Sequence, residues 1–213
     1  MSLDFVAIDF ETANRRHGSP CQVGLALVHD GRIQDTWGSL MRPPYGYGWF
    51  DPNCTEVHGI VERDLEGQPG FEDLWPAIET RLTGHPVMAH NAAFDIAVIR
   101  ESTSHCGFEW PTLDFGCSLL LARRHYDLPE HTLDAVAAAA GIPLDCHHDA
   151  VHDAVACALI TVDMVRRVSA TSLDDLLQIS GIAWGRMAPD HHEPCHPTRA
   201  AAEPDRQRAP TLF

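Results

Sequence analysis

The sequence predicts an α/β domain in which helices pack on a mixed β-sheet. Two observations carry this prediction. A short apolar strand near the N-terminus precedes a β-hairpin, and helix and strand patterns alternate through the rest of the chain. This order brings antiparallel and parallel pairs into one sheet, which we expect to have five strands with helices on its faces.

The length and composition fit one domain. The chain has 213 residues, of which 45% are hydrophobic and 21% are charged, and this excludes a disordered or fibrous chain. The only long apolar run, residues 133–142, is mostly alanine and falls short of the roughly 20 apolar residues of a membrane span. The N-terminus lacks the basic and apolar segments of a secretory signal. We therefore expect a cytoplasmic protein that does not contact membranes.

The charge limits the classes of function. Fifteen basic and 30 acidic residues give a net charge of −15, the wrong sign for holding nucleic acid by phosphate neutralisation alone. A nucleic-acid role would need metal ions or a local basic patch. All 15 basic residues are arginine, so mechanisms that use a catalytic lysine are excluded. The seven cysteines include no C-x-x-C pair, and we expect reduced thiols.

The first elements are β-strands. Residues 3–11 are apolar and β-prone, which is typical of a short central strand covered on both faces. Residues 21–29 and 32–40 flank Asp30-Gly31, a dipeptide that favours a two-residue type I′ turn because both residues take positive φ. These segments predict an antiparallel hairpin beside the first strand.

Helices and strands alternate from residue 71 onward. Apolar residues at helical spacing predict a helix over residues 71–82, and we expect Pro76 in its first turn, where its missing N–H costs nothing. The last predicted helix, residues 149–168, is long and amphipathic. The other elements expected here are a strand over 86–90, a helix from Phe94 to Gly107, a strand near 112–115, and helices near 118–125 and 132–140.

The composition changes after about Trp184. Five of the 15 prolines lie between Pro189 and Pro210, among charged residues and histidines with almost no apolar ones. Such a segment cannot bury enough apolar surface to fold. We therefore expect a folded domain over residues 1–185 and a flexible proline-rich tail over residues 186–213.

Two acidic positions could carry chemistry at strand ends. Asp9-Phe10-Glu11-Thr12 ends the first strand, and the two-residue period of a strand puts the Asp9 and Glu11 carboxylates on one face. Like charges at this distance repel unless a cation such as Mg²⁺ or Mn²⁺ lies between them. Asp95 follows the strand at 86–90, where α/β sheets bind ligands. A solvated turn and an acid at a helix N-terminus are the structural alternatives.

A third polar group spans residues 146–154 and contains three histidines and two aspartates. Cys146, His148 and His152 could be zinc ligands, because histidines four residues apart lie on one side of a helix. The His-Asp dipeptides also resemble those of HD-type phosphohydrolases, which are all-helical, and the predicted strands argue against that class. Asp149 and Asp153 are one helical turn apart, so either could reach a metal over the sheet.

Together these groups resemble a known family. In chain order they are Asp9-x-Glu11-Thr12, Asn91-x-x-x-Asp95 and His148-x-Ala150-x-x-Asp153. They look like the three exonuclease motifs of the histidine-bearing (DEDDh) branch of the DEDD superfamily, and most like those of the proofreading epsilon subunits of bacterial DNA polymerase III. The resemblance covers about residues 3–168 and includes Val57-His58-Gly59-Ile60.

The resemblance implies a ribonuclease H-like fold and removal of nucleotides, one at a time, from the 3′ end of a nucleic acid, with single-stranded DNA favoured. Two ions, Mg²⁺ or Mn²⁺, would activate water and stabilise the leaving oxygen, while His148 would be the general base, placed in a loop or first turn before the last helix. The residues implied as ion ligands are Asp9, Glu11, Asp95 and Asp153. The residues implied to border the 3′-terminal nucleotide are Phe10, Thr12, His58 and Ile60, of which Phe10 and Ile60 also suit the core.

Other functions stay open at this point. They are a 3′–5′ exoribonuclease of the same fold, a non-catalytic polymerase or clamp adaptor, and an HD- or zinc-type nucleotide phosphohydrolase. DNA and RNA differ by a 2′-OH, whose recognition depends on a few contacts. The sequence ends in Leu212-Phe213, which resembles the close of short peptides that bind the bacterial sliding clamp. Packing of these two residues on the domain is the alternative.

Overall fold

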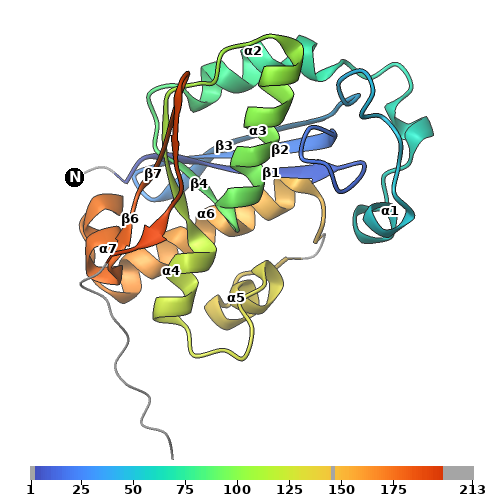
Figure 1. Cartoon of the computed structure of the whole chain (residues 1–213). Helices are drawn as coiled ribbons and strands as arrows, with labels where there is room; N and C mark the ends of the chain where they lie inside the picture. The colour runs from blue at the N-terminus through green and yellow to red at the C-terminus, as the bar shows by residue number, and fades with distance from the viewer. Residues whose placement is uncertain (1–2, 145–146, 199–213) are drawn as a thin grey trace, which may run out of the picture.

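A seven-stranded mixed β-sheet forms the centre of the molecule in the computed structural model, which describes residues 3–144 and 147–198 (Figure 1). The strand order is β3-β2-β1-β4-β5-β7-β8. The strands β1, β2 and β3 pair antiparallel in chain order, and β4 and β5 run parallel to β1. β7 pairs antiparallel with β5, and β8 pairs antiparallel with β7. The bounds are β1 (Phe5–Thr12), β2 (Pro20–His29), β3 (Arg32–Leu40), β4 (Val87–Ala89), β5 (Leu113–Cys117), β7 (Gly185–Ala188) and β8 (His191–Glu193).

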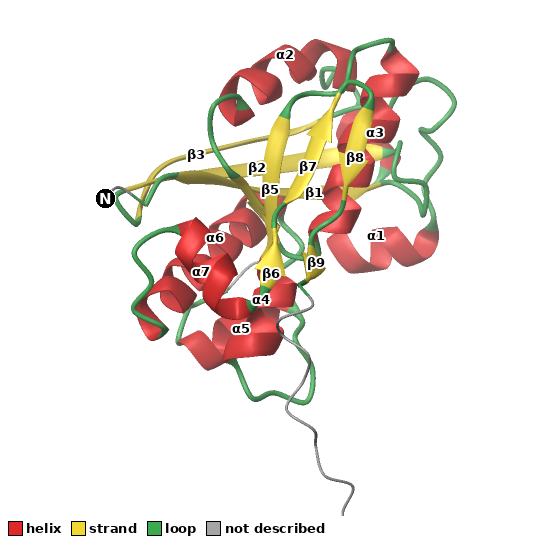
Figure 2. Ribbon diagram, turned by 60° about the vertical axis from the view of Figure 1, so that its left-hand side comes forward, coloured by secondary structure: helices red, strands yellow, loops and turns green. Residues whose placement is uncertain are grey.

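Helices cover both faces of the sheet (Figures 1 and 2). One core packs α2 and α3 against Val6, Ile8 and their neighbours on one face. The other packs α4, α5, α6 and α7 against Phe5, Ala7 and their neighbours on the opposite face. The helix bounds are α1 (Pro52–His58), α2 (Phe71–Leu82), α3 (Ala92–Cys106), α4 (Ser118–His125), α5 (Leu133–Ala140), α6 (Ala150–Arg167) and α7 (Leu173–Ser180), and a short 3₁₀ helix, η1, covers Glu62–Leu65.

The predicted fold class is confirmed and all five predicted strands form, but the sheet has seven strands and not the expected five, because β7 and β8 extend it beyond β5. Asp30 and Gly31 take φ values of 50° and 68°, as the predicted hairpin turn requires. Pro76 departs from the prediction, because α2 begins at Phe71 and Pro76 therefore lies in its second turn. The helix tolerates the missing N–H because its apolar face, which includes the buried Trp75 and Ile78, is held by the core.

The sheet continues beyond the predicted domain boundary at residue 185, and this corrects the interpretation of everything after that residue as a tail. β7 pairs with β5, and Met187 opposite Leu113 is only 1% exposed. Two short strands, β6 (Ile182–Ala183) and β9 (His196–Pro197), pair separately. The average composition did not indicate this because one buried apolar residue, Met187, and a paired backbone are enough to add a short strand to the sheet. The rest of the predicted tail, residues 199–213, lies outside the described residues.

Two expectations about chemistry and location can be compared with the fold. The described cysteines, which are all but Cys146, are free thiols. Among the helices of the described residues, none combines the length and the apolar character needed to cross a membrane. The cytoplasmic location stays a prediction.

Candidate active site

Four carboxylates from three elements meet at the end of β1. Asp9 and Glu11 lie on β1, Asp95 lies in the first turn of α3, and Asp153 lies in the first turn of α6. Ligand oxygens of Asp9, Glu11 and Asp153 lie within 4.8 Å of one another. Asp95 is 1% exposed and Asp153 is 4% exposed, so both reach the group from inside the protein.

Asp95 is positioned by the backbone N–H of Phe10, which has no partner on β4. Val6 donates its N–H to the carbonyl oxygen of Pro86, just before β4, and the two-residue period of a strand directs the N–H of Phe10 to the same side. β4 ends at Ala89, before it could pair with this part of β1. The Phe10 N–H instead donates to Asp95 Oδ1 at 3.1 Å. This bond fixes the start of α3 beside the last residues of β1.

A glycine allows α6 to lie directly on the sheet. Gly24 on β2 pairs with Asp9, and a Cβ atom at this position would lie 2.0 Å from the carbonyl oxygen of Ala150. No side chain fits between the strand and the start of α6, so only glycine permits the approach. The first turn of the helix, which carries Asp153, is thereby held next to Asp9.

Asp149 is used to begin α6, which separates its role from that of Asp153. Its carboxylate accepts hydrogen bonds from the N–H groups of Val151 and His152, as an N-cap does. Gln22, opposite Glu11 on β2, donates to Asp149 Oδ2 at 3.0 Å and accepts from the Ala150 N–H at 3.2 Å. This role of Gln22 was not predicted from the sequence. The feature that could have indicated it is a polar side chain in a strand that is otherwise mostly buried.

Burial raises the pKa values of all four carboxyl groups. Burial is the largest cause in each case, and the charges of the other carboxylates add to it for Asp9 and Glu11. The pKa of Glu11 is raised to about 8 and that of Asp153 to about 6. The pKa values of Asp9 and Asp95 are raised well above the ordinary range. A cation among these groups reverses the effect, because it stabilises their charged forms.

The donor set fits a hard divalent cation. Carboxylate oxygens are the ligands that Mg²⁺ and Mn²⁺ prefer. Among the described residues, Asp95 Oδ2 and Asp153 Oδ1 are buried oxygens without a hydrogen-bond partner. A buried acceptor without a partner costs free energy, and coordination to a metal ion removes that cost.

Two histidines lie beside Asp153. His148 occupies the turn before α6 with a φ of 66°, as predicted, and its backbone N–H donates to Asp153 Oδ2 at 3.0 Å. The His147 ring stacks on the His148 ring with centroids 3.8 Å apart, and its Nε2 lies 3.8 Å from Asp153 Oδ2. Burial, followed by the charge of His147, lowers the pKa of His148. The side chain therefore stays neutral at pH 7 and can accept a proton.

The possible zinc ligands predicted from the sequence were Cys146, His148 and His152, and the structure does not bring the two histidines together. His152 is exposed, and its Nδ1 is bonded to Asp149 Oδ1 at 2.9 Å, so it does not join His148 as a ligand. Cys146 lies outside the described residues. His147, His148 and Asp153 do offer ligand atoms within 4.8 Å of one another. From the sequence, His147 is one of several extra potential ligands in this segment, and its position in a turn, which has no helical period, does not predict where its side chain lies.

The residues implied to border a nucleotide divide into two groups. His58, at the end of α1, donates from Nε2 to the Thr12 carbonyl at 3.1 Å and accepts the Ile60 N–H on Nδ1 at 3.0 Å. Thr12, His58 and Ile60 therefore lie together beside the end of β1. Phe10 is 2% exposed and packs in the core. Its side chain does not face an open site, which corrects that expectation, and its backbone N–H holds Asp95 instead.

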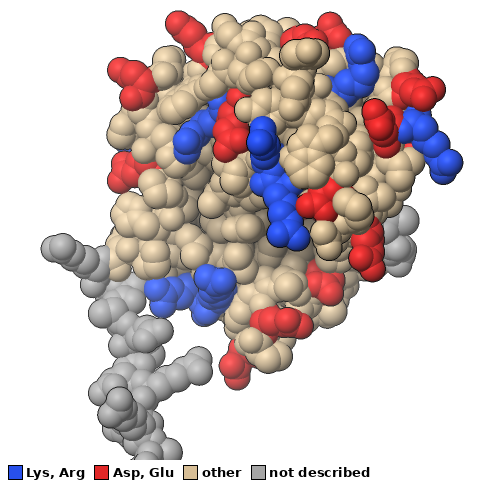
Figure 3. All heavy atoms as spheres, turned by 45° about the vertical axis from the view of Figure 1, so that its right-hand side comes forward, with Lys and Arg blue, Asp and Glu red and all other residues tan. Residues whose placement is uncertain are grey.

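Basic and acidic side chains are mixed on the face drawn in Figure 3. Arginine side chains there are interspersed with carboxylates, in keeping with the net charge of −15. This face of the described residues therefore offers no extended basic surface for holding a duplex through its phosphates alone. Binding must be concentrated at particular places.

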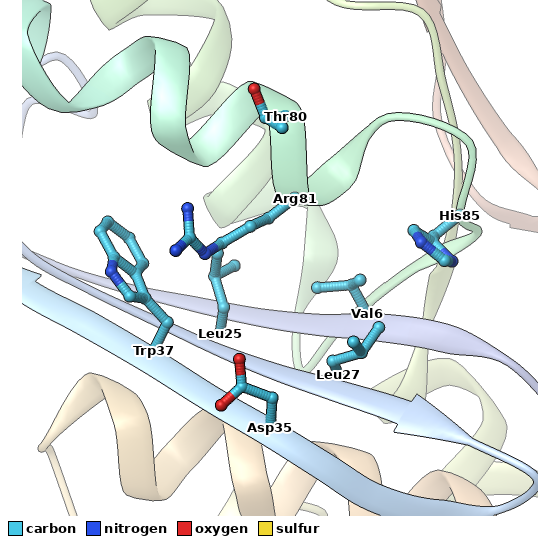
Figure 4. A pocket seen from close by; sticks show the side chains of 8 residues that line it. All are labelled: Val6, Leu25, Leu27, Asp35, Trp37, Thr80, Arg81 and His85. Carbon is cyan, nitrogen blue, oxygen red and sulfur yellow. The ribbon is translucent and has the colours of Figure 1, made fainter.

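A cavity on the α2 side of the sheet is distinct from the carboxylate group (Figure 4). It has a volume of about 130 Å³ between α2 and the β2–β3 hairpin. The Arg81 guanidinium lies 4.5 Å above the Trp37 ring, and the acidic side chain there is Asp35. One carboxylate beside an arginine lacks the cluster of oxygens that a metal site needs, so this cavity is not a candidate metal site.

Comparison with known proteins identifies the family. The sequence model of the exonuclease family (RNase_T) matches residues 6–161. The chain belongs to this exonuclease family. The predicted DEDD-superfamily membership and ribonuclease H-like fold are confirmed by this match and by related structures. Proteins of the family depend on divalent metal ions and hydrolyse nucleic acids, and the predicted enzyme class is confirmed. The seven-stranded sheet excludes the all-helical HD class.

Similar proteins include a DNA polymerase and two nucleases. The PolC-type DNA polymerase III of Clostridium perfringens is 30% identical over 162 residues, which are 74% of this chain and 11% of the polymerase. Exonuclease X in complex with 5′ overhanging duplex DNA superimposes with a TM-score of 0.67 and 23% identity, over 83% of this chain and 99% of that one. A 3′-exonuclease that recognises the 3′ end of a histone mRNA stem-loop superimposes with a TM-score of 0.65 and 16% identity, over 76% of this chain and 81% of that one. The chain spans only 11–14% of the first PolC-type relatives.

Proposed function

We propose that this exonuclease removes nucleoside monophosphates from the 3′ end of DNA with two divalent ions, Mg²⁺ or Mn²⁺. The observation that carries the proposal is the group of four carboxylates, which three separate elements bring together at the end of β1. Four oxygen-rich side chains with two unpartnered buried oxygens match the demands of a two-ion site for phosphodiester hydrolysis.

The proposed ion ligands are Asp9, Glu11, Asp95 and Asp153. When bound, such ions polarise the scissile phosphate and lower the pKa of an attacking water. His148 accepts the proton of that water, which its lowered pKa allows near neutrality. The bond from its backbone N–H to Asp153 Oδ2 holds this residue at the edge of the carboxylate group. His147 stacks on the ring and restricts its orientation.

The terminal nucleotide is proposed to lie beside Thr12, His58 and Ile60. The two hydrogen bonds of His58 fix its ring between the Thr12 carbonyl and the Ile60 N–H, so these three residues form a preformed edge next to the metal ligands. Because these side chains are already ordered, they can orient a 3′ end without losing conformational entropy when the substrate binds.

DNA is favoured over RNA by the similarity to a DNA polymerase and to exonuclease X in complex with DNA. The similarity to an mRNA 3′-exonuclease supports RNA as the second candidate substrate. Digestion of 5′-labelled single-stranded DNA and RNA of matched sequence, with Asp95→Asn as the inactive control, separates the two. We expect a ladder of shortening DNA products that depends on Mg²⁺ or Mn²⁺. If the wild type hydrolyses neither strand, the proposed activity is wrong and a non-catalytic adaptor is the remaining function.

A polymerase or clamp partner is also proposed. The residues that suggest it, Leu212 and Phe213, lie outside the described residues. The support is the sequence of residues 207–213 and the similarity to a PolC-type DNA polymerase III. Binding to a clamp would raise the local concentration of the nuclease near DNA.

A further inference from the structure

Two neighbouring cavities form one groove that leads away from the carboxylate group. The first, of about 580 Å³, is lined by His147 and His148. The second, of about 440 Å³, is lined by Arg100 of α3 and His192 of β8. Both cavities share Asn91, Leu119 and Arg123, so they join beside the start of α3 and along α4.

Arg100 is held in place at the far end of this groove. Its guanidinium carbon lies 5.0 Å from the centre of the Trp110 ring, and its Nη1 donates to His192 Nδ1 at 3.3 Å. The Nε of Arg100 is buried and has no hydrogen-bond partner among the described residues. Since arginine only donates, Nδ1 of His192 must be the acceptor, which leaves the Nε2–H of His192 as a further donor.

Arg123 provides a second cation where the cavities join. It is exposed at the end of α4 and lines both cavities. None of the ion pairs among the described residues involves Arg100 or Arg123. Leu119 and Phe115 supply an apolar wall between the two charges. The acidic residue that lines the first cavity is Glu130, and it forms no ion pair with Arg123 among the described residues. In a chain with a net charge of −15, two arginines without ion pairs in one groove are a local exception.

We infer that Arg100, Arg123 and His192 form a phosphate-binding subsite for the strand upstream of the 3′-terminal nucleotide. This inference rests on the proposed function and adds a substrate path to it. The guanidinium groups match phosphate oxygens, and the apolar wall suits the bases or sugars between the phosphates. Figure 3 shows arginine side chains on both sides of a hollow in the surface. β8, which lies beyond the predicted domain boundary, thereby contributes to substrate binding.

The test measures binding of a hydrolysis-resistant phosphorothioate octathymidylate by fluorescence anisotropy at several salt concentrations. The variants are Arg100→Ala, Arg123→Ala and, as the matched control, Arg124→Ala. Arg124 is the exposed neighbour on the same helix and lines neither cavity. Each lost phosphate contact lowers the slope of log K against log salt by about 0.7, which corresponds to about fivefold weaker binding at 0.1 M salt. We expect this loss for Arg100→Ala and Arg123→Ala and wild-type binding for Arg124→Ala.

A second measurement separates this inference from the proposed function. The wild type and both groove variants are assayed on a dinucleotide and on the unmodified octamer. We expect the KM for the octamer to rise about fivefold more than that for the dinucleotide. Unchanged salt slopes in both groove variants, or an equal loss in Arg124→Ala, would overturn the subsite even when the wild type cleaves both substrates. If Arg100→Ala does not fold, the exposed Arg123→Ala decides alone. Failure of the wild type to cleave either substrate overturns the proposed function.

Discussion

Replacing Glu11 by glutamine should abolish nuclease activity and yet stabilise the metal-free protein. The pKa of Glu11 is raised from its ordinary 4.5 to about 8, first by burial and then by the charges of Asp153 and Asp95. At 1.36 kcal/mol per pH unit, this rise corresponds to about 5 kcal/mol of destabilisation above pH 8. Relaxation of neighbouring groups reduces the amount, so we expect Glu11→Gln to raise the free energy of unfolding by about 2 to 5 kcal/mol at pH 8.

The sign of the effect defines the pH window. A carboxyl group with a raised pKa in the folded state is protonated in both folded and unfolded chains at pH 4 and costs little there. Between pH 4.5 and 8 the unfolded chain releases its proton while the folded chain retains it, so stability falls as pH rises. The advantage of Glu11→Gln should therefore be less than about 1 kcal/mol at pH 4 and largest at pH 8.

Urea unfolding in excess EDTA at pH 4, 6 and 8 measures this difference. Glu109→Gln is the matched control, because Glu109 is exposed and outside the carboxylate group, and it should unfold like the wild type at every pH. Saturating Mg²⁺ should stabilise the wild type more than Glu11→Gln, since the variant loses one ligand. Equal stability of Glu11→Gln and the wild type at pH 8 without metal would show that burial and neighbouring carboxylates do not destabilise the charged form of Glu11.

Three further predictions follow from the site and the end of the chain. His148→Ala should lower kcat about 10² to 10⁴-fold, whereas His152→Ala should have little effect, and steady-state kinetics that show the reverse would reassign the base. Mg²⁺ should raise the melting temperature of the wild type more at pH 8 than at pH 5, because the ion competes with protons for the carboxylates, and equal shifts in a thermal melt would contradict this. Deletion of Leu212 and Phe213 should weaken clamp binding without changing hydrolysis of short oligonucleotides, and equal affinity in a clamp titration would remove the partner.

Sequence periodicity was sufficient for the elements that carry the candidate site. The alternation of β1 placed the Asp9 and Glu11 side chains on one face, and the helical period placed Asp153 in the first turn of α6. Periodicity could not place Gln22, because its role depends on α6 lying across β2. It also could not reveal β7, whose pairing with β5 is set by a long-range contact between Met187 and Leu113.

The position of the site follows from where the sheet stops. β1 extends beyond the last pair that β4 provides, so the N–H of Phe10 needs another acceptor, and Asp95 supplies it with one oxygen while its second oxygen stays buried without a partner. The bond that ends the sheet therefore also places an unpartnered oxygen next to Asp9. A hydrophobic residue at position 95 would leave the Phe10 N–H unsatisfied, and an asparagine would keep that bond without the charge. Asp95→Asn should therefore fold like the wild type and lose metal binding, which isothermal titration with Mn²⁺ would show. If Asp95→Asn binds Mn²⁺ as tightly as the wild type does, Asp95 holds the Phe10 N–H but is not a metal ligand.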